Sequence, residues 1–244
     1  YFPNTNITGS LMDDNGNVVI AGRFWDSTNF IDNSRLDVIR SQGESDGFIS
    51  SYSSSGELLW NIHFGGFLID GIYDITLAPD GNIIAVGQIN GQVYFSDLDE
   101  IQTNDYTPII LKINSTNGSI IWKKTIPGLS NKGARHVTIN SNNEIIGILG
   151  KAQGIGGRTS PHFFKIDYLT GDIVSIESFH FSADYLSEIR DITIDNENNF
   201  ILTGRGDGPI YFDKNGDGDP LIGTEYLFMS KYDSDFNLIW ALNI

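Results

Sequence analysis

The stretch DGFISSYSSSGELLWNIHF, from Asp46 to Phe64, decides the fold because similar stretches recur three more times along the chain. It is typical of two short strands joined by a turn at Ser55-Gly56. The other copies are PIILKINSTNGSIIWKKTI (108–126), PHFFKIDYLTGDIVSIESF (161–179) and EYLFMSKYDSDFNLIWALNI (225–244). Their turns centre on positions 56, 118, 171 and 236, so the spacings are 62, 53 and 65 residues. The chain is therefore an internal repeat.

Two further strands precede each copy. A short alternating segment comes first, at 7–12, 73–77, 135–139 and 190–194. A turn rich in Asn, Asp and Gly follows, at 14–16, 79–81, 141–143 and 197–198, and its residues tolerate the positive φ of hairpin turns. The next segment is an unbroken apolar run, as in Asn82-Ile-Ile-Ala-Val-Gly87, which fits a strand covered on both faces.

Four units of four antiparallel strands at this period predict an all-β fold, a β-propeller built of four-stranded blades. We expect one domain over 1–244, with blades at approximately 7–64, 73–126, 135–182 and 189–244. Tryptophans recur with the period at 60, 122 and 240, which indicates packing between blades. The third unit departs from the pattern, because it has Ser175 where the others have Trp.

The segments 46–60 and 230–240 also resemble the seven-bladed β-propeller (SBBP) repeat, and Phe64-Gly-Gly66 fits it as well. The resemblance covers nearly the whole chain and implies a propeller of a secreted or surface-displayed bacterial protein, without a catalytic motif in the repeat. Seven blades at this period would need about 420 residues. Two alternatives follow: four blades close into a ring, or the chain is part of a larger propeller. The sequence favours the second, because neither a latch nor a disulfide would hold a four-blade ring.

Composition excludes several classes of protein. The formal net charge is −16 and the fifteen basic residues are scattered, which argues against nucleic acid as a partner. The longest apolar runs are far shorter than the roughly twenty residues that cross a bilayer, so we expect no membrane insertion. The absence of cysteine excludes disulfides and thiolate metal sites. The chain starts with Tyr1 instead of Met, which indicates a segment of a longer or processed precursor.

The acidic segment Asp213-Lys-Asn-Gly-Asp-Gly-Asp219 predicts a structural Ca²⁺ site. Oxygens at its first, third and fifth positions converge when a glycine allows a sharp turn, and hard oxygen ligands suit Ca²⁺. The predicted ligands are Asp213, Asn215, Asp217 and Asp219. Thr224 stands where an EF-hand has its bidentate Glu, so the loop lacks the full motif; a solvated turn is the alternative. For a second acidic segment, 96–100, we expect a solvated loop.

Polar residues begin the first strand of three units, where a propeller binds ligands near its axis. The candidates are Tyr73, Asp74, Arg135, His136, Arg190 and Asp191. They could bind a polar ligand, or Asp74 and Asp191 could act as acid and base with His136 or Arg190, although hydrogen bonding between blades also explains them. The sequence contains no nucleophile elbow.

These observations favour a non-catalytic extracellular or cell-surface propeller that recognises protein or glycan at a loop face, with Ca²⁺ as a structural ion. The alternative is a polysaccharide hydrolase or lyase with carboxylates at the axis. A scaffold role within a larger chain or assembly has the same sequence features as recognition.

Overall fold

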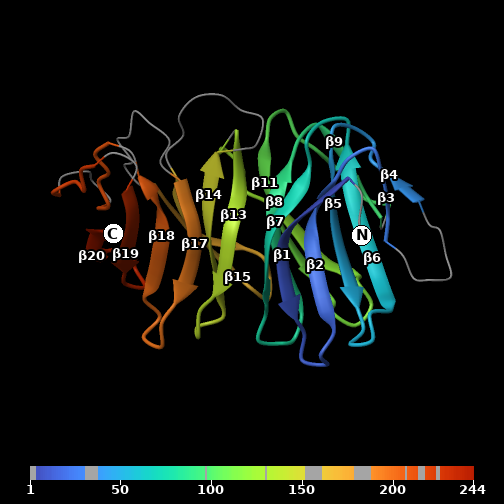
Figure 1. Ribbon diagram of the computed structural model, residues 1–244, viewed down its shortest axis with the longest axis horizontal. Coiled ribbons are helices and arrows are strands. Elements are labelled where there is room, and N and C mark those ends of the chain that lie inside the picture. Colours follow the sequence, from blue (N-terminus) through green and yellow to red (C-terminus); the bar gives the residue numbers. More distant parts are fainter. Residues whose placement is uncertain are drawn as a thin grey trace. The chain divides into compact units, whose positions relative to one another are not determined.

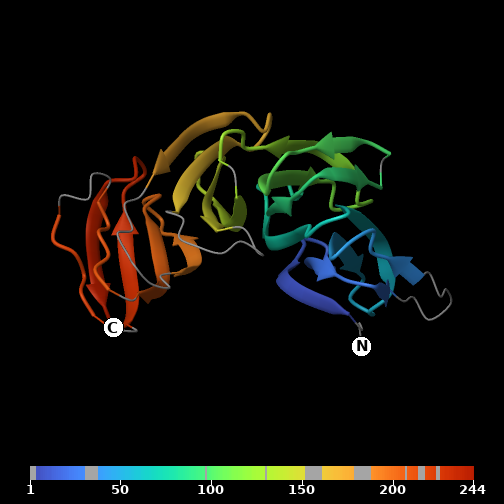
Figure 2. The same ribbon diagram turned by 90° about the horizontal axis from the view of Figure 1, so that it is seen from above.

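The computed structural model describes residues 4–30, 38–96, 98–129, 131–151, 161–178, 188–206, 208–213, 218–223 and 226–244. Every regular element within these residues is a β-strand (Figures 1 and 2). The same residues contain no helix that is long and apolar enough to cross a membrane. The predicted all-β class is therefore confirmed.

The strands form four blades in chain order, and the pairings are antiparallel, as between β2 and β5 or between β18 and β19. Blade 1 contains β1 (Thr5–Met12), β2 (Val18–Phe24), β5 (Asp46–Tyr52) and β6 (Leu58–Gly66). Blade 2 contains β7 (Gly71–Leu77), β8 (Ile83–Ile89), β11 (Thr107–Ile113) and β12 (Ile120–Thr125). Blade 3 contains β13 (Lys132–Ile139), β14 (Glu144–Lys151), β15 (His162–Asp167) and β16 (Ile173–Ser178). Blade 4 contains β17 (Glu188–Ile194), β18 (Phe200–Gly206), β19 (Tyr226–Tyr232) and β20 (Leu238–Asn243).

The turns inside the blades have the predicted backbone conformation. In the first hairpin of each blade, φ is positive at Gly16, Gly81, Asn143 and Asn198. In the second hairpin, φ is positive at Gly56, Gly118, Gly171 and Phe236. Polar side chains fix several of these turns; Asp195 Oδ1, for example, accepts hydrogen bonds from the backbone N–H groups of Glu197 and Asn199, both at 2.9 Å.

Two insertions add hairpins to the repeat. Strand β9 (Gln92–Phe95) pairs with the outer strand β6 of blade 1 and with β10 (Glu100–Gln102), so the first sheet has six strands. Leu98 and Asp99 of the acidic segment thus lie in the turn of this hairpin, and Asp99 forms an ion pair with Lys123 at 2.9 Å. In blade 1, β3 (Ser27–Asn29) pairs with β4 (Val38–Arg40) as a separate two-stranded sheet. Phe30, which directly follows β3, packs on Phe24 and Phe48.

The chain divides into two compact units within β13: unit 1 ends at Arg135 and unit 2 starts at His136. Unit 1 holds blades 1 and 2, and unit 2 holds nearly all of blades 3 and 4. Each unit has an apolar core between its blades, one built around Ile49, Ile83 and Leu111 and the other around Phe163, Phe200 and Phe228.

Blades 1 and 2 meet through Trp60 and a bare turn. The indole Nε1 of Trp60 donates to the carbonyl oxygen of Ser115 at 2.8 Å. A Cβ on Gly118, whose φ is +73°, would lie 2.7 Å from the indole ring. The periodic tryptophan is therefore a packing residue, as predicted, and it needs a glycine on the turn of the next blade.

Between blades 3 and 4 the aromatic ring comes from the turn of the second blade instead of the outer strand of the first. Blade 3 has Ser175 at the tryptophan position, and blade 4 supplies an aromatic ring from its turn. Phe236 is 2% exposed despite a φ of +64°, and its ring centroid lies 5.1 Å from that of Phe163 and 4.8 Å from that of Phe200. Lys165, which pairs with Ser175 across the strands, lies over the Phe236 ring. Each of these two contacts therefore has one aromatic side chain, which comes from the first blade in one and from the second blade in the other.

We predict that Gly118→Ala destabilises the protein more than Gly16→Ala. Both glycines have a positive φ, so alanine costs about 1–2 kcal/mol at either turn. Only at Gly118 does the new Cβ overlap a ring, which adds about 1–3 kcal/mol of overpacking, whereas no atom lies within 4 Å of a Cβ at Gly16. Urea unfolding of both variants measures the difference; equal losses would contradict the Trp60 contact.

Candidate functional site

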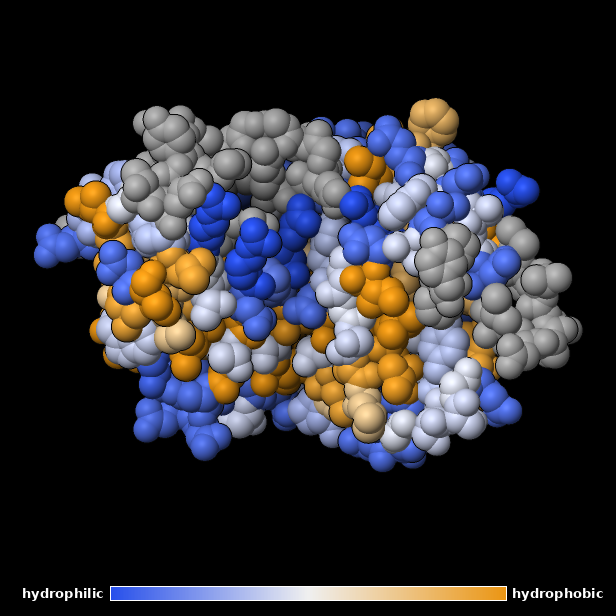
Figure 3. Space-filling model, in the orientation of Figure 1, coloured by the Kyte–Doolittle hydropathy of each residue, from blue (hydrophilic) through white to orange (hydrophobic). Residues whose placement is uncertain are grey.

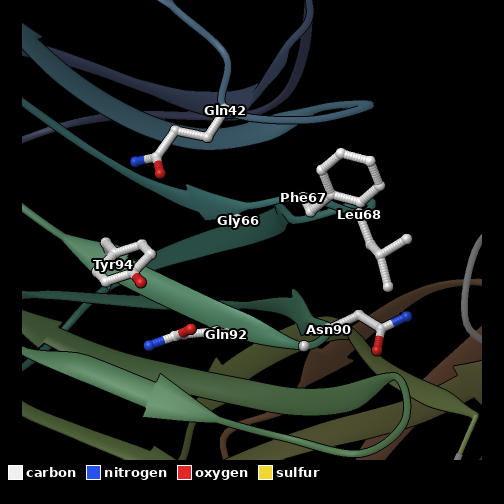
Figure 4. A pocket seen from close by; sticks show the side chains of 8 residues that line it. Gln42, Gly66, Phe67, Leu68, Asn90, Gln92 and Tyr94 are labelled. Carbon is white, nitrogen blue, oxygen red and sulfur yellow. The ribbon is translucent and has the colours of Figure 1, made fainter.

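A cleft in unit 1 lies where β6, β9 and the segment after β8 come together (Figure 4). Its volume is about 300 Å³. We call it the β6–β9 cleft, and it is lined by Gln42, Gly66, Phe67, Leu68, Asn90, Gly91, Gln92 and Tyr94. In Figure 4 the carboxamides of Gln42 and Gln92 point to the side of Tyr94, and that of Asn90 lies on the side of Phe67 and Leu68. None of these side chains carries a charge at neutral pH.

Two fully buried carboxylates hold the backbone of this cleft. Asp70 accepts hydrogen bonds from the backbone N–H groups of Gly66 and Asn90, both at 2.8 Å. Asp46 Oδ2 accepts one from the N–H of Gln42 at 3.0 Å. Three of the lining residues are therefore fixed through their own main chain, which gives the cleft a preformed shape.

Burial raises the pKa of both carboxyl groups. Desolvation raises the pKa of Asp70 to about 7 against the hydrogen bonds from Asn90 and Gly66, and the nearby Asp46 adds to the rise. Desolvation likewise raises the pKa of Asp46 to about 6. Asp46 also requires a glycine beside it, because a Cβ on Gly65 would lie 2.2 Å from the Asp46 Cγ. Both carboxyls are 0% exposed and therefore position backbone instead of reaching a ligand.

The side chains of the cleft offer neutral hydrogen-bonding groups beside aromatic rings. Asn90 is only 8% exposed, and its carboxamide has no hydrogen-bond partner among the described residues. Gln92 Nε2 donates to Glu100 at 3.0 Å, which orients the amide. Phe67 is 81% exposed and Tyr94 is 43% exposed. An amide with no partner among the described residues, beside two exposed rings, suits an uncharged polar ligand.

The structure brings together two of the predicted axial residues, Tyr73 and Arg135. The Arg135 guanidinium lies 4.0 Å from the centroid of the Tyr73 ring, a cation–π contact. Tyr73 is 9% exposed, and burial raises the pKa of its hydroxyl to about 12, against the effect of Arg135 and Arg23. The neighbouring Asp74 lies next to a β-bulge, and its Oδ1 accepts from the N–H of Ile75 at 2.9 Å.

The other axial candidates belong to unit 2. Asp191 repeats the arrangement of Asp74, because it also follows a register shift and its Oδ1 accepts from the N–H of Ile192 at 2.8 Å. Arg190 is exposed and His136 is half-buried. Since Asp74 and Asp191 lie in different units, the acid–base pair of the enzyme alternative stays a prediction from the sequence.

The predicted Ca²⁺ loop is anchored at its base. Ile210 and Leu221 form an antiparallel bridge, and the Tyr232 hydroxyl donates to the carbonyl oxygen of Phe212 at 2.9 Å. Asp213 Oδ2 accepts from the N–H of Gly218 at 2.9 Å, which draws the two ends of the acidic segment together. Asn215 and Asp217 lie outside the described residues. Within the residues that are described, no three His, Asp or Glu side chains form a metal-binding group.

Sequence reasoning did not find the β6–β9 cleft. Its polar residues come from the insertions of blade 1 and blade 2, and its apolar residues Phe67 and Leu68 come from the linker between the two blades, all of which the repeat alignment leaves out. One signal was present: Asp46-Gly47 and Asp70-Gly71 place a carboxylate directly before Gly at the start of an apolar strand. Such an Asp is not needed for a turn there and indicates a buried backbone acceptor.

Comparisons with known proteins give structural similarity alone. No family model matches the chain, so membership of the SBBP family stays a prediction, and no curated protein matches it. A protein of unknown function from Bacteroides caccae is 13% identical, with a TM-score of 0.36 and coverage of 99% of this chain and 83% of that one. The Dos1 propeller is 9% identical (TM-score 0.37; 99% and 85% covered). BamB from Moraxella catarrhalis is 10% identical (TM-score 0.32; 98% and 77% covered). The fold assignment rests on the blades and turns of this chain.

We predict that Asp70 makes stability fall as pH rises. The folded protein keeps the Asp70 proton up to about pH 7, whereas the unfolded chain loses it near pH 4. The folded state thus binds more protons in this window, and the Asp70 contribution to the unfolding free energy decreases from pH 4 to pH 7. Asp70→Asn removes this titration. The unfolding free energy of the wild type minus that of the variant, both measured by urea unfolding, should therefore decrease from pH 4 to pH 7. A constant difference would contradict the buried, protonated carboxyl.

Proposed function

We propose that this chain is a non-catalytic β-propeller that acts as a recognition module for protein or glycan, with the β6–β9 cleft as its binding site. The supporting observation is an uncharged, preformed cleft on a chain of net charge −16. An acidic surface repels acidic partners at long range, while the cleft selects by neutral hydrogen bonds and ring contacts. We therefore expect a ligand segment without net charge.

The fixed backbone of the cleft supports recognition over catalysis. Asp70 and Asp46 hold Gly66, Asn90 and Gln42 in place, so little ordering is needed when a ligand binds. The lining residues include no carboxylate, histidine, serine or lysine that could act as an acid, a base or a nucleophile. A peptide backbone and a sugar both offer the donors, acceptors and stacking face that the cleft complements.

We further propose an extracellular or cell-surface location with Ca²⁺ as a structural ion in the 213–219 loop. The resemblance to the SBBP repeat motivates the location. Asp213 and Asp219 stand at the two ends of a loop whose base is anchored by Ile210 and Leu221. A weak site of this kind would be filled at the millimolar calcium found outside cells.

We predict that Asn90→Ala and Tyr94→Ala each weaken ligand binding about tenfold, because a lost hydrogen bond or ring contact costs about 1–2 kcal/mol. Arrays of uncharged peptides and of neutral glycans identify the ligand and separate the two classes, and calorimetry on the best hit gives the affinities. Gln102→Ala is the matched control, since Gln102 is an exposed amide on β10 outside the cleft. Binding that survives both cleft substitutions would contradict the assignment.

We predict that 10 mM Ca²⁺ stabilises the chain by about 1.4 kcal/mol if the dissociation constant is about 1 mM. For a chain of this size the melting temperature should then rise by about 3–5 °C. Asp213→Ala with Asp219→Ala should abolish the rise, while Asp99→Ala, in the other acidic segment, should leave it unchanged. An equal rise with Mg²⁺ would indicate screening of charge instead of a site.

A further inference from the structure

Blade 4 carries the face that blade 1 uses to contact blade 2, and no described residue buries this face in blade 4. The alignment of the repeats makes each of its residues equivalent to one in blade 1. The blade 1 set is Val19, Ala21, Ile49, Trp60, Ile62 and Phe64. The blade 4 set, in the same order, is Ile201, Thr203, Met229, Trp240, Leu242 and Ile244. We call the second set the blade 4 face.

The two faces differ in exposure. In blade 1 the six residues are between 0% and 8% exposed, because blade 2 covers them. In blade 4 none of the six is buried, and Leu242 and Ile244 are 42% and 72% exposed. Apolar surface also shows at the left of Figure 3, where β19 and β20 lie. A face with this residue pattern is unfavourable in water and indicates a contact surface.

Blade 1 carries a counterpart of the surface that covers such a face. The insertion of blade 1 covers one end of it, where Phe30 packs on Phe24 and Phe48 beside Ile20, and the other end, at Val18 and Gly56, is exposed. Blade 2 contacts blade 1 with Ile83, Ala85 and the bare turn at Gly118, which receives Trp60. The equivalent residues of blade 1 are Val18, which is 39% exposed, half-buried Ile20, and Gly56. Among the described residues, a Cβ on Gly56 would meet no atom within 4 Å, so their side chains leave this turn open.

The described contacts between blades each contain one aromatic side chain, and by this pattern the blade 4 face is complementary to the surface of blade 1. Within the chain, Trp60 meets a glycine turn. The Phe236 ring, which stands on a turn, lies under Lys165, the strand partner of Ser175. Two rings at one contact would overlap, and none would leave a cavity. Trp240 on the blade 4 face requires a glycine turn, and Gly56 provides one.

We propose that the blade 4 face of one chain docks on the surface of blade 1 that carries Val18 and Gly56 in a second copy, with Trp240 packing on the Gly56 turn. The contact is heterologous, joining different surfaces of the two copies, so it closes into a ring or extends head to tail. This inference concerns another surface than the β6–β9 cleft and does not depend on the proposed function.

Sedimentation equilibrium of the full chain tests the proposal, over about 1–500 μM in about 0.15 M salt, which screens the repulsion between acidic copies. We expect assemblies of two or more copies. Trp240→Ser should weaken association at least tenfold, because it leaves a cavity. Gly56→Phe should also weaken association at least tenfold, because the new ring collides with Trp240. The variant should fold, since the equivalent turn of blade 4 already holds Phe236. In both turns the backbone N–H at this position donates to the carbonyl oxygen three residues earlier.

A compensating pair of substitutions distinguishes the loss of this contact from misfolding of the single variants. The double variant Trp240→Ser/Gly56→Phe combines a serine at the tryptophan position with a phenylalanine on the turn, as Ser175 and Phe236 do in blades 3 and 4, and should associate within about threefold of wild type. An equimolar mixture of the two single variants should associate as well, because each contact then has one ring. Gly128→Phe is the control, since Gly128 also has a positive φ and open space but lies outside both surfaces. A monomeric wild type, or single variants that associate normally, would overturn the proposal. So would folded single variants that neither the mixture nor the double variant restores.

Discussion

A blade of this repeat is apolar on both faces, so it is stable only when a neighbour covers each face. Strand β8 shows this most clearly, because all of its residues from Ile83 to Ile89 are buried. Such a strand belongs between two layers, and the four-stranded sheet that contains it cannot remain exposed in water. The insertion of blade 1 and the aromatic ring that the turn of blade 4 supplies to blade 3 both satisfy this constraint. The blade 4 face, by contrast, is not buried by any described residue.

The aromatic ring from the turn of blade 4 shows how the constraint tolerates substitution. Loss of the tryptophan at Ser175 would leave a cavity, and a cavity of that size in a core costs several kcal/mol. Phe236 fills the same place from the other blade, even though a phenylalanine there must adopt a left-handed backbone conformation. In both contacts an aromatic ring thus occupies the space between the blades, although the residue that supplies the ring differs.

The sequence predicted the repeat, the turns with positive φ at Gly56 and Gly118 and the packing role of Trp60, because these depend on local spacing. It did not predict the β6–β9 cleft, since Gln42, Asn90 and Tyr94 come together only through the pairing of β9 with β6. That pairing is long-range and has no signature in the spacing. The role of Asp70 was hidden for the same reason, because its partners Gly66 and Asn90 lie on different segments.

The pairing of β9 with β6 has a consequence for how the chain can evolve. The β9–β10 hairpin belongs to blade 2 in sequence but extends the sheet of blade 1. Deleting or duplicating blade 1 alone would leave Val93 and Phe95 of the hairpin without the strand that covers them. In this half of the protein the smallest piece that recombination can move intact is therefore a pair of blades, although the sequence repeat corresponds to one blade.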